Sequence, residues 1–235
     1  MEIKHPANPI RSWRDFFIHM GTVGAGLLLA LGFEQAVNAV RHHHEVTELR
    51  DALRKDAGNA IEQTVKLDDL ETQQITRFTT MGDEIRYAAV HHQAVAAPPP
   101  PSHGDYDMPD DPAWQAAKTG GVAQLLAPEE LQAYDEIEVT IHHVFEAWLA
   151  RYECDRRLNA ALAQFHTDFN SPKAGDYSSA TPEEQRQLAL LFYEDASARV
   201  RLRRMARELH GAERAIQNGE RNLPKILSAE RDFLQ

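Results

Sequence analysis

The feature that most constrains this chain is the stretch FFIHMGTVGAGLLLALGF at residues 16–33, which contains no Asp, Glu, Lys or Arg. As an α-helix, these 18 residues would be roughly 27 Å long, close to the hydrocarbon thickness of a bilayer. His19 is the one ionisable side chain within it. We therefore predict a transmembrane helix over residues 16–36, preceded by a short polar tail at residues 1–15.

Two other interpretations of this stretch stay open on the sequence alone. Ala30 and Gly32 would provide a small-x-small cleavage site of the kind that ends a secretory signal peptide, although the apolar run is longer than usual for one. A buried core helix of a soluble protein would be similarly apolar. The four glycines of the stretch would be unfavourable in such a helix, whereas glycine is common in membrane spans.

Small side chains recur along one face of the predicted span. Thr22, Gly26 and Ala30 follow one another at intervals of four residues, and Gly21 with Ala25 forms a neighbouring pair. Rows of small residues allow another membrane helix to approach closely, so that packing drives association. We expect this face to pack against a second copy or against another membrane protein; the alternative is an ordinary span that faces lipid.

The positive charges around the span indicate its orientation. Lys4, Arg11 and Arg14 precede it, whereas only Arg41 and Arg50 lie in the twenty residues after Phe33. By the positive-inside rule, the N-terminus is expected in the cytoplasm and the C-terminal domain on the exported side.

Composition narrows the function classes for the rest of the chain. The formal net charge of −11 argues against a general nucleic-acid binder. Cys154 is the only cysteine, so an intramolecular disulfide is excluded. The residues after the span are enough for one core of ordinary size.

Residues 37–96 predict a stalk that continues into the first helix of a bundle, because apolar residues recur there at intervals of three and four. The phase of this pattern shifts between Lys66 and Glu71, which marks a candidate break. Asp56 and Gln63 occupy positions that a regular heptad would leave apolar. This irregularity favours packing within a bundle over a free coiled coil.

Residues 97–112 (APPPPSHGDYDMPDDP) predict a Pro- and Asp-rich loop. Its aspartates resemble a calcium-binding loop only loosely, because Pro109 stands where an EF-hand needs an acid.

Residues 113–235 predict the remainder of the bundle. A short helix over 113–126 is interrupted at Gly120, a long helix begins at Pro128, and Thr181 with Glu184 forms a capping box for another helix. In that last helix Asp195 is the one polar break of the apolar stripe. Its arginines predict a solvated face paired with the acidic preceding helix; they are Arg199, Arg201, Arg203, Arg204 and Arg207. The predicted fold is all-α: one transmembrane helix, a long stalk helix and an antiparallel helical bundle.

Candidate metal ligands are present, but no complete motif contains them. The sequence HEVTE at residues 44–48 lacks the second histidine of a zincin, and Glu138 with His142 is spaced one residue too widely for a di-iron bundle site. The weak candidates for a metal site are His42, His43, His44, Glu138 and His142. We predict no cofactor, and the chain lacks GxSxG, Walker, GxGxxG and CxxC motifs.

The segments GLLLALGFEQ and HHHEVTELRDAL resemble the membrane exit and the following His-rich stretch of a family of uncharacterised bacterial single-pass inner-membrane proteins, a domain of unknown function. A second block, around Ala113-Trp114 with Gly120, Leu125, Leu126 and Tyr134, is similar to a later block of the same family. The resemblance implies a single-pass layout and a bacterial origin. Together with the orientation indicated by the positive charges, it leads us to expect a bacterial inner-membrane protein with its C-terminal domain in the periplasm. The resemblance implies no chemistry.

Together these features predict a non-enzymatic scaffold or accessory subunit of a larger membrane complex. Its expected partners are the lipid bilayer and, through the span, itself or another membrane protein. The alternative is an extracytoplasmic, sensor-like bundle that binds a small ligand or a metal. An enzyme is a third class, for which the sequence offers no set of catalytic residues.

Overall fold

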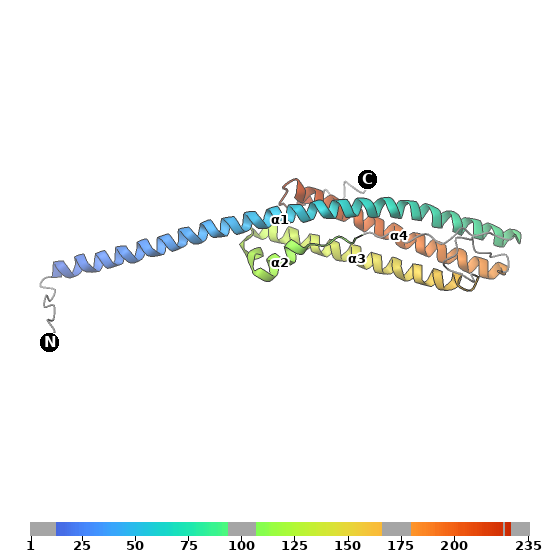
Figure 1. The fold of residues 1–235 in the computed structure, drawn as a ribbon, viewed down its shortest axis with the longest axis horizontal. Helices are drawn as coiled ribbons and strands as arrows, with labels where there is room; N and C mark the ends of the chain where they lie inside the picture. Colours follow the sequence, from blue (N-terminus) through green and yellow to red (C-terminus); the bar gives the residue numbers. More distant parts are fainter. Residues whose placement is uncertain (1–12, 94–106, 166–179, 223, 227–235) are drawn as a thin grey trace, which may run out of the picture. The chain divides into compact units, whose positions relative to one another are not determined.

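The computed structural model describes residues 13–93, 107–165, 180–222 and 224–226. In these residues all regular structure is helical, which confirms the predicted all-α class and the long N-terminal helix. The elements are α1 (Trp13–His91), α2 (Pro112–Gly120), the 3₁₀ helix η1 (Val122–Leu125), α3 (Pro128–Leu162) and α4 (Pro182–Gln217) (Figure 1). The chain divides into two compact units, residues 1–48 and residues 49–235, so α1 contributes to both.

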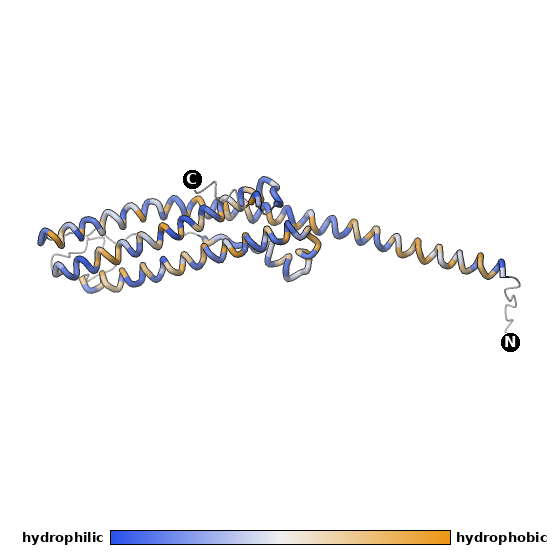
Figure 2. The backbone as a smooth tube through the Cα atoms, turned by 180° about the vertical axis from the view of Figure 1, so that it is seen from behind, coloured by the Kyte–Doolittle hydropathy of each residue, from blue (hydrophilic) through white to orange (hydrophobic). Residues whose placement is uncertain are grey.

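The described part of the first unit is the N-terminal portion of α1. Its apolar residues are coloured orange in Figure 2, and none of its most apolar 18-residue window is buried. Among the described residues, α1 is the one helix long and apolar enough to cross a membrane, a test that a signal sequence also passes. The large side chains exposed here include Phe17, Leu27, Leu28, Leu29, Leu31 and Phe33.

The second unit is built from residues 49–91 of α1 together with α3 and α4, which Figure 1 shows side by side. Helices α1 and α4 run antiparallel, because contacts later in α1 are made to residues earlier in α4. These contacts are Thr64 with His210, Glu71 with Arg199, and Phe78 with Phe192. The predicted antiparallel packing is therefore confirmed for this pair.

Helices α1 and α3 run in the same direction. Arg50 pairs with Glu130, 80 residues later, and Glu71 pairs with Arg151, also 80 residues later (151 − 71 = 80). Helix α4 is thus antiparallel to both neighbours. Gln185 at the start of α4 donates to the carbonyl of Gln93, just after α1, whereas the amide of Ala113 at the start of α2 donates to Asp56.

The candidate break between Lys66 and Glu71 is wrong, since α1 continues through it without interruption. Two polar residues in this region, Thr64 and Glu71, are each only 1% exposed. When they are counted with the buried apolar residues, buried positions recur every three or four residues through the region without a break. The apparent phase shift arose because these buried polar side chains interrupt the apolar pattern but not the buried face.

The predicted helix ends are confirmed in the bundle. Helix α3 begins at Pro128, and Gly121 ends α2 with a φ of 77°, a left-handed conformation that favours glycine. At the start of α4 the amide of Glu184 donates to the Thr181 hydroxyl, and the amide of Thr181 donates to the Glu184 carboxylate. This is the predicted capping box.

At the end of the bundle where α4 begins, all three long helices contribute to an apolar core. The rings of Phe78 and Phe192 pack at its centre, with their centroids 5.7 Å apart. Further buried members of this core include Met81, Ile85, Leu158, Leu162, Leu188 and Ala196.

Candidate functional site

The five residues of the predicted small-residue face lie on the exposed N-terminal portion of α1. A Cβ atom added at Gly21 or Gly26 would meet no other atom within 4 Å. The Thr22 hydroxyl donates to the carbonyl of Ile18, 2.9 Å away, so it is satisfied within its own helix. The face formed by Gly21, Thr22, Ala25, Gly26 and Ala30 is therefore open to a neighbouring helix.

The predicted metal candidates make ordinary polar contacts. His42, His43 and His44 are exposed, and Nε2 of His44 lies 3.1 Å from the Glu48 carboxylate. Glu138 accepts a hydrogen bond from Gln115 at 2.7 Å and pairs with Lys118, whereas His142 is exposed. In the described parts of the chain, no three His, Cys, Asp or Glu side chains are placed to hold a metal ion.

Two other groups of charged residues lie in the second unit. The first, which we term the ionic cluster, consists of Glu71 from α1, Arg151 and Asp155 from α3, and Asp195 and Arg199 from α4. Arg199 is its centre and is only 2% exposed. Its guanidinium donates to Glu71 at 3.0 Å, to Asp155 at 2.7 Å and to Asp195 at 2.5 Å, so it joins carboxylates of all three helices.

The ionic cluster contains three carboxyl groups and two guanidinium groups. Burial and the adjacent carboxyl group of Asp155 raise the pKa of Asp195 to about 7. With one proton on Asp195, the cluster has no net charge. Its members are buried and bonded to one another across three helices, an arrangement suited to fixing their relative register.

The prediction that the arginines of α4 form one solvated face is wrong for three of them. Arg199 is buried, and Arg203 and Arg207 both donate to Asp68 of α1, at 2.8 and 2.7 Å. The partners of these arginines therefore come largely from α1, whereas the acidic helix α3 supplies Asp155. Arg201 is exposed, as the sequence predicts.

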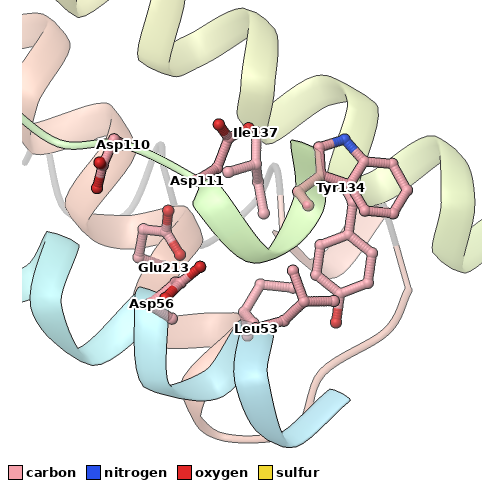
Figure 3. A pocket seen from close by; sticks show the side chains of 10 residues that line it. Leu53, Asp56, Asp110, Asp111, Tyr134, Ile137 and Glu213 are labelled. Carbon is pink, nitrogen blue, oxygen red and sulfur yellow. The ribbon is translucent and has the colours of Figure 1, made fainter. Parts of the chain in front are cut away.

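The second group lines a small pocket near the start of α2, which we term the acidic pocket (Figure 3). The pocket has a cavity volume of about 20 Å³, which leaves room for one water molecule or one small ion. Four acids contribute to the lining, and the remaining walls are apolar or aromatic. The lining residues are Leu53, Asp56, Ala57, Asp110, Asp111, Trp114, Tyr134, Ile137, Glu213 and Ile216.

Each element around the acidic pocket has a local reason to be there. Asp56 accepts a hydrogen bond from the amide of Ala113 at 2.8 Å, so it holds the first turn of α2 against α1. The rings of Trp114 and Tyr134 pack with centroids 5.2 Å apart and hold α2 against α3. Burial raises the pKa of Tyr134 to about 12, so its phenol stays neutral.

Glu213 has the most strongly shifted pKa of the residues that line the acidic pocket. Its side chain is 5% exposed, and Figure 3 shows it directed toward Asp56. Burial, together with the negative charges of Asp111 and Asp56, raises the pKa of Glu213 to about 8. Burial also raises the pKa of Asp111. A carboxyl group in such a place either holds a proton or needs a cation.

Sequence reasoning missed the acidic pocket, although two signals were visible. Asp56 interrupts the apolar pattern of α1, and Asp110-Asp111 comes just before the helix that begins at Pro112. Glu213 gives no such signal, because it stands among the charged residues of a highly charged helix.

No protein family, curated protein or solved structure matches this chain.

Proposed function

We propose that the protein is a non-enzymatic, single-pass membrane protein that acts as a scaffold or accessory subunit of a larger membrane complex. The observation that supports this is the exposed apolar segment at residues 16–33, none of whose most apolar window is buried. A run of exposed side chains such as Leu27, Leu28 and Leu29 in water would be unfavourable, and large apolar surfaces of this kind mark membrane or protein contacts.

The open face around Gly26 supports association within the membrane. Lipid tails are as apolar as the helix, so close packing of small residues is the main driving force available for helix association. The partner is a second copy of this chain or the span of another membrane protein.

The proposed orientation of the protein in the membrane follows from the charges around the span. The N-terminus lies in the cytoplasm, and the bundle lies on the periplasmic side of a bacterial inner membrane. The net charge of −11 leaves nucleic acid out of the expected partners.

Membrane fractionation tests the anchor. The full chain should stay in the membrane pellet after alkaline carbonate extraction. Leu27→Arg places a charge within the span, which costs about 2.5–3.5 kcal/mol, so the pellet fraction should fall. Leu190→Arg in α4 is a matched control, because Leu190 and Leu27 are both 61% exposed. Release of the unmodified chain by carbonate would contradict the anchor.

A second candidate function is a sensor-like bundle that binds a small ligand on the periplasmic side. The acidic pocket favours it, because Glu213 is buried there beside other acids. Copurification of a stoichiometric membrane partner with the chain in mild detergent would favour the accessory-subunit function. A homogeneous protein whose stability responds to a ligand would favour the sensor.

A further inference from the structure

The acidic pocket has acceptors in excess of donors. Glu213 is 5% exposed and makes no hydrogen bond to any described residue, while Asp56 receives one from the Ala113 amide and Asp111 receives long ones from Gln115. None of the ten lining residues is Lys, Arg or His. No cationic side chain of the described residues therefore lines the pocket itself, and Lys118 acts on Asp111 from outside it.

A chelated metal ion does not fit the described geometry. A hard cation such as Ca²⁺ needs six or more oxygen ligands converging on one point. No three acidic or histidine side chains of the described residues converge in this way. The requirement is thus for a cation that brings its own hydrogen-bond donors and needs no cage of ligands.

We propose that the acidic pocket binds the ammonium group of a primary amine. An ammonium group has three N–H donors and is about the size of a water molecule, the volume that the pocket offers. Glu213 and Asp56 face one another across the pocket from α4 and α1 and would accept two of these donors (Figure 3). The third donor is left to water, and Asp111 at the start of α2 adds its negative charge beside the site.

The remaining walls of the pocket suit a cation. The rings of Trp114 and Tyr134 favour a nearby positive charge, and the volume admits the ammonium group alone, so the alkyl part of the ligand would lie outside the pocket. The amine is either a free small molecule or a lysine side chain of a partner protein. Both present the same chemistry to the pocket.

Thermal unfolding of the full chain in detergent tests the proposal with n-propylammonium chloride as the probe. At about pH 8.5, where Glu213 is largely ionised, the amine should raise Tm in a saturable way, by about 3 °C at ten times its Kd. Sodium chloride and tetramethylammonium chloride at equal concentration are the controls. Tetramethylammonium has the same charge but no N–H donor, so it should give no rise beyond that of sodium.

Glu213→Gln should abolish the rise, and Asp111→Asn should weaken it. Glu194→Gln is the matched control, since Glu194 is an exposed acid of the same helix α4. The rise should also shrink at about pH 6, because the proton on Glu213 then competes with the amine. A rise of equal size with tetramethylammonium, a rise retained in Glu213→Gln, or a larger rise with CaCl₂ or MgCl₂ would overturn the proposal, as would the absence of any saturable rise.

Carbodiimide coupling in native membranes distinguishes the two sources of the amine. An amide bond between Glu213 or Asp56 and a lysine would identify a partner's side chain as the ligand. Uncoupled Glu213, together with saturable propylammonium binding, would indicate a free amine.

Discussion

Arg199 of α4 donates a hydrogen bond from Nη1 to Oε2 of Glu71 in α1, 3.0 Å away and 128 residues earlier in the chain. Both side chains are within the bundle, at 2% and 1% exposure. Because the same guanidinium also bonds Asp155 of α3, one residue fixes the relative register of all three long helices. A shift of any helix by one turn would leave buried charges without partners.

Arg199→Met should therefore destabilise the bundle by about 3–5 kcal/mol, since it leaves Glu71, Asp155 and Asp195 without their shared cation. Arg201→Met, at an exposed position of the same helix, should change stability by less than about 0.5 kcal/mol. Chemical denaturation followed by circular dichroism measures both. Equal, small effects of the two substitutions would show that the ionic cluster does not hold the bundle together.

The acidic pocket predicts a stability that falls as pH rises. Glu213 has a pKa of about 8 in the folded chain against a usual value of 4.5. Between these values the folded state keeps a proton that the unfolded state has released, so stability is lost as the pH rises toward 8. The slope from one such group is at most about 1.4 kcal/mol per pH unit.

Glu213→Gln should flatten this slope and make the protein more stable than the unmodified chain at about pH 8. Denaturation curves recorded between about pH 5 and about pH 9 provide the measurement. Asp195, whose pKa is also raised, contributes a slope of the same sign that the substitution leaves in place. An unchanged pH dependence in Glu213→Gln would mean that Glu213 is ionised in the folded state.

Gly82 of α1 allows the close approach of Tyr193 from α4. A Cβ atom at Gly82 would lie 2.9 Å from the Tyr193 ring, whose hydroxyl donates to Asp83 at 2.7 Å. Gly82→Ala should therefore push the ring away and break that bond. Gly58→Ala, in the same helix, is the control, because its Cβ would meet only the end of the Gln217 side chain at 3.4 Å.

The two alanine variants gain the same helix propensity, about 1 kcal/mol, so their difference isolates the steric effect. We expect Gly82→Ala to be less stable than Gly58→Ala by about 1–3 kcal/mol, measured by chemical denaturation. Equal stabilities would mean that the α1–α4 contact adjusts without loss.

The sequence allowed the helix boundaries to be predicted because their causes are local. Pro128, the Thr181 capping box and the glycine after α2 act within a few residues of themselves. The interior polar groups were not predictable in the same way. In the sequence, Glu71 and Arg199 look like ordinary solvated residues. They are 128 positions apart, and only the packing of α4 against α1 shows that they are buried together.

The direction of α3 relative to α1 was also beyond local signals. The Arg50–Glu130 pair depends on the end of the bundle at which α3 begins. Asp56 illustrates the same limit: its polarity was visible as an irregularity in the stripe, but its role in holding Ala113 required the fold.

Native mass spectrometry in mild detergent tests most directly whether the face formed by Thr22, Gly26 and Ala30 associates within the membrane. Gly26→Leu fills that face, whereas Gly24→Leu places the same side chain about 160° away around the helix. A Cβ atom added at either glycine meets no atom within 4 Å beyond the local helix backbone, so the two positions are matched in the space around them. We expect an oligomer or a stoichiometric complex that Gly24→Leu retains and Gly26→Leu loses. A Gly26→Leu assembly with unchanged stoichiometry would contradict association through this face.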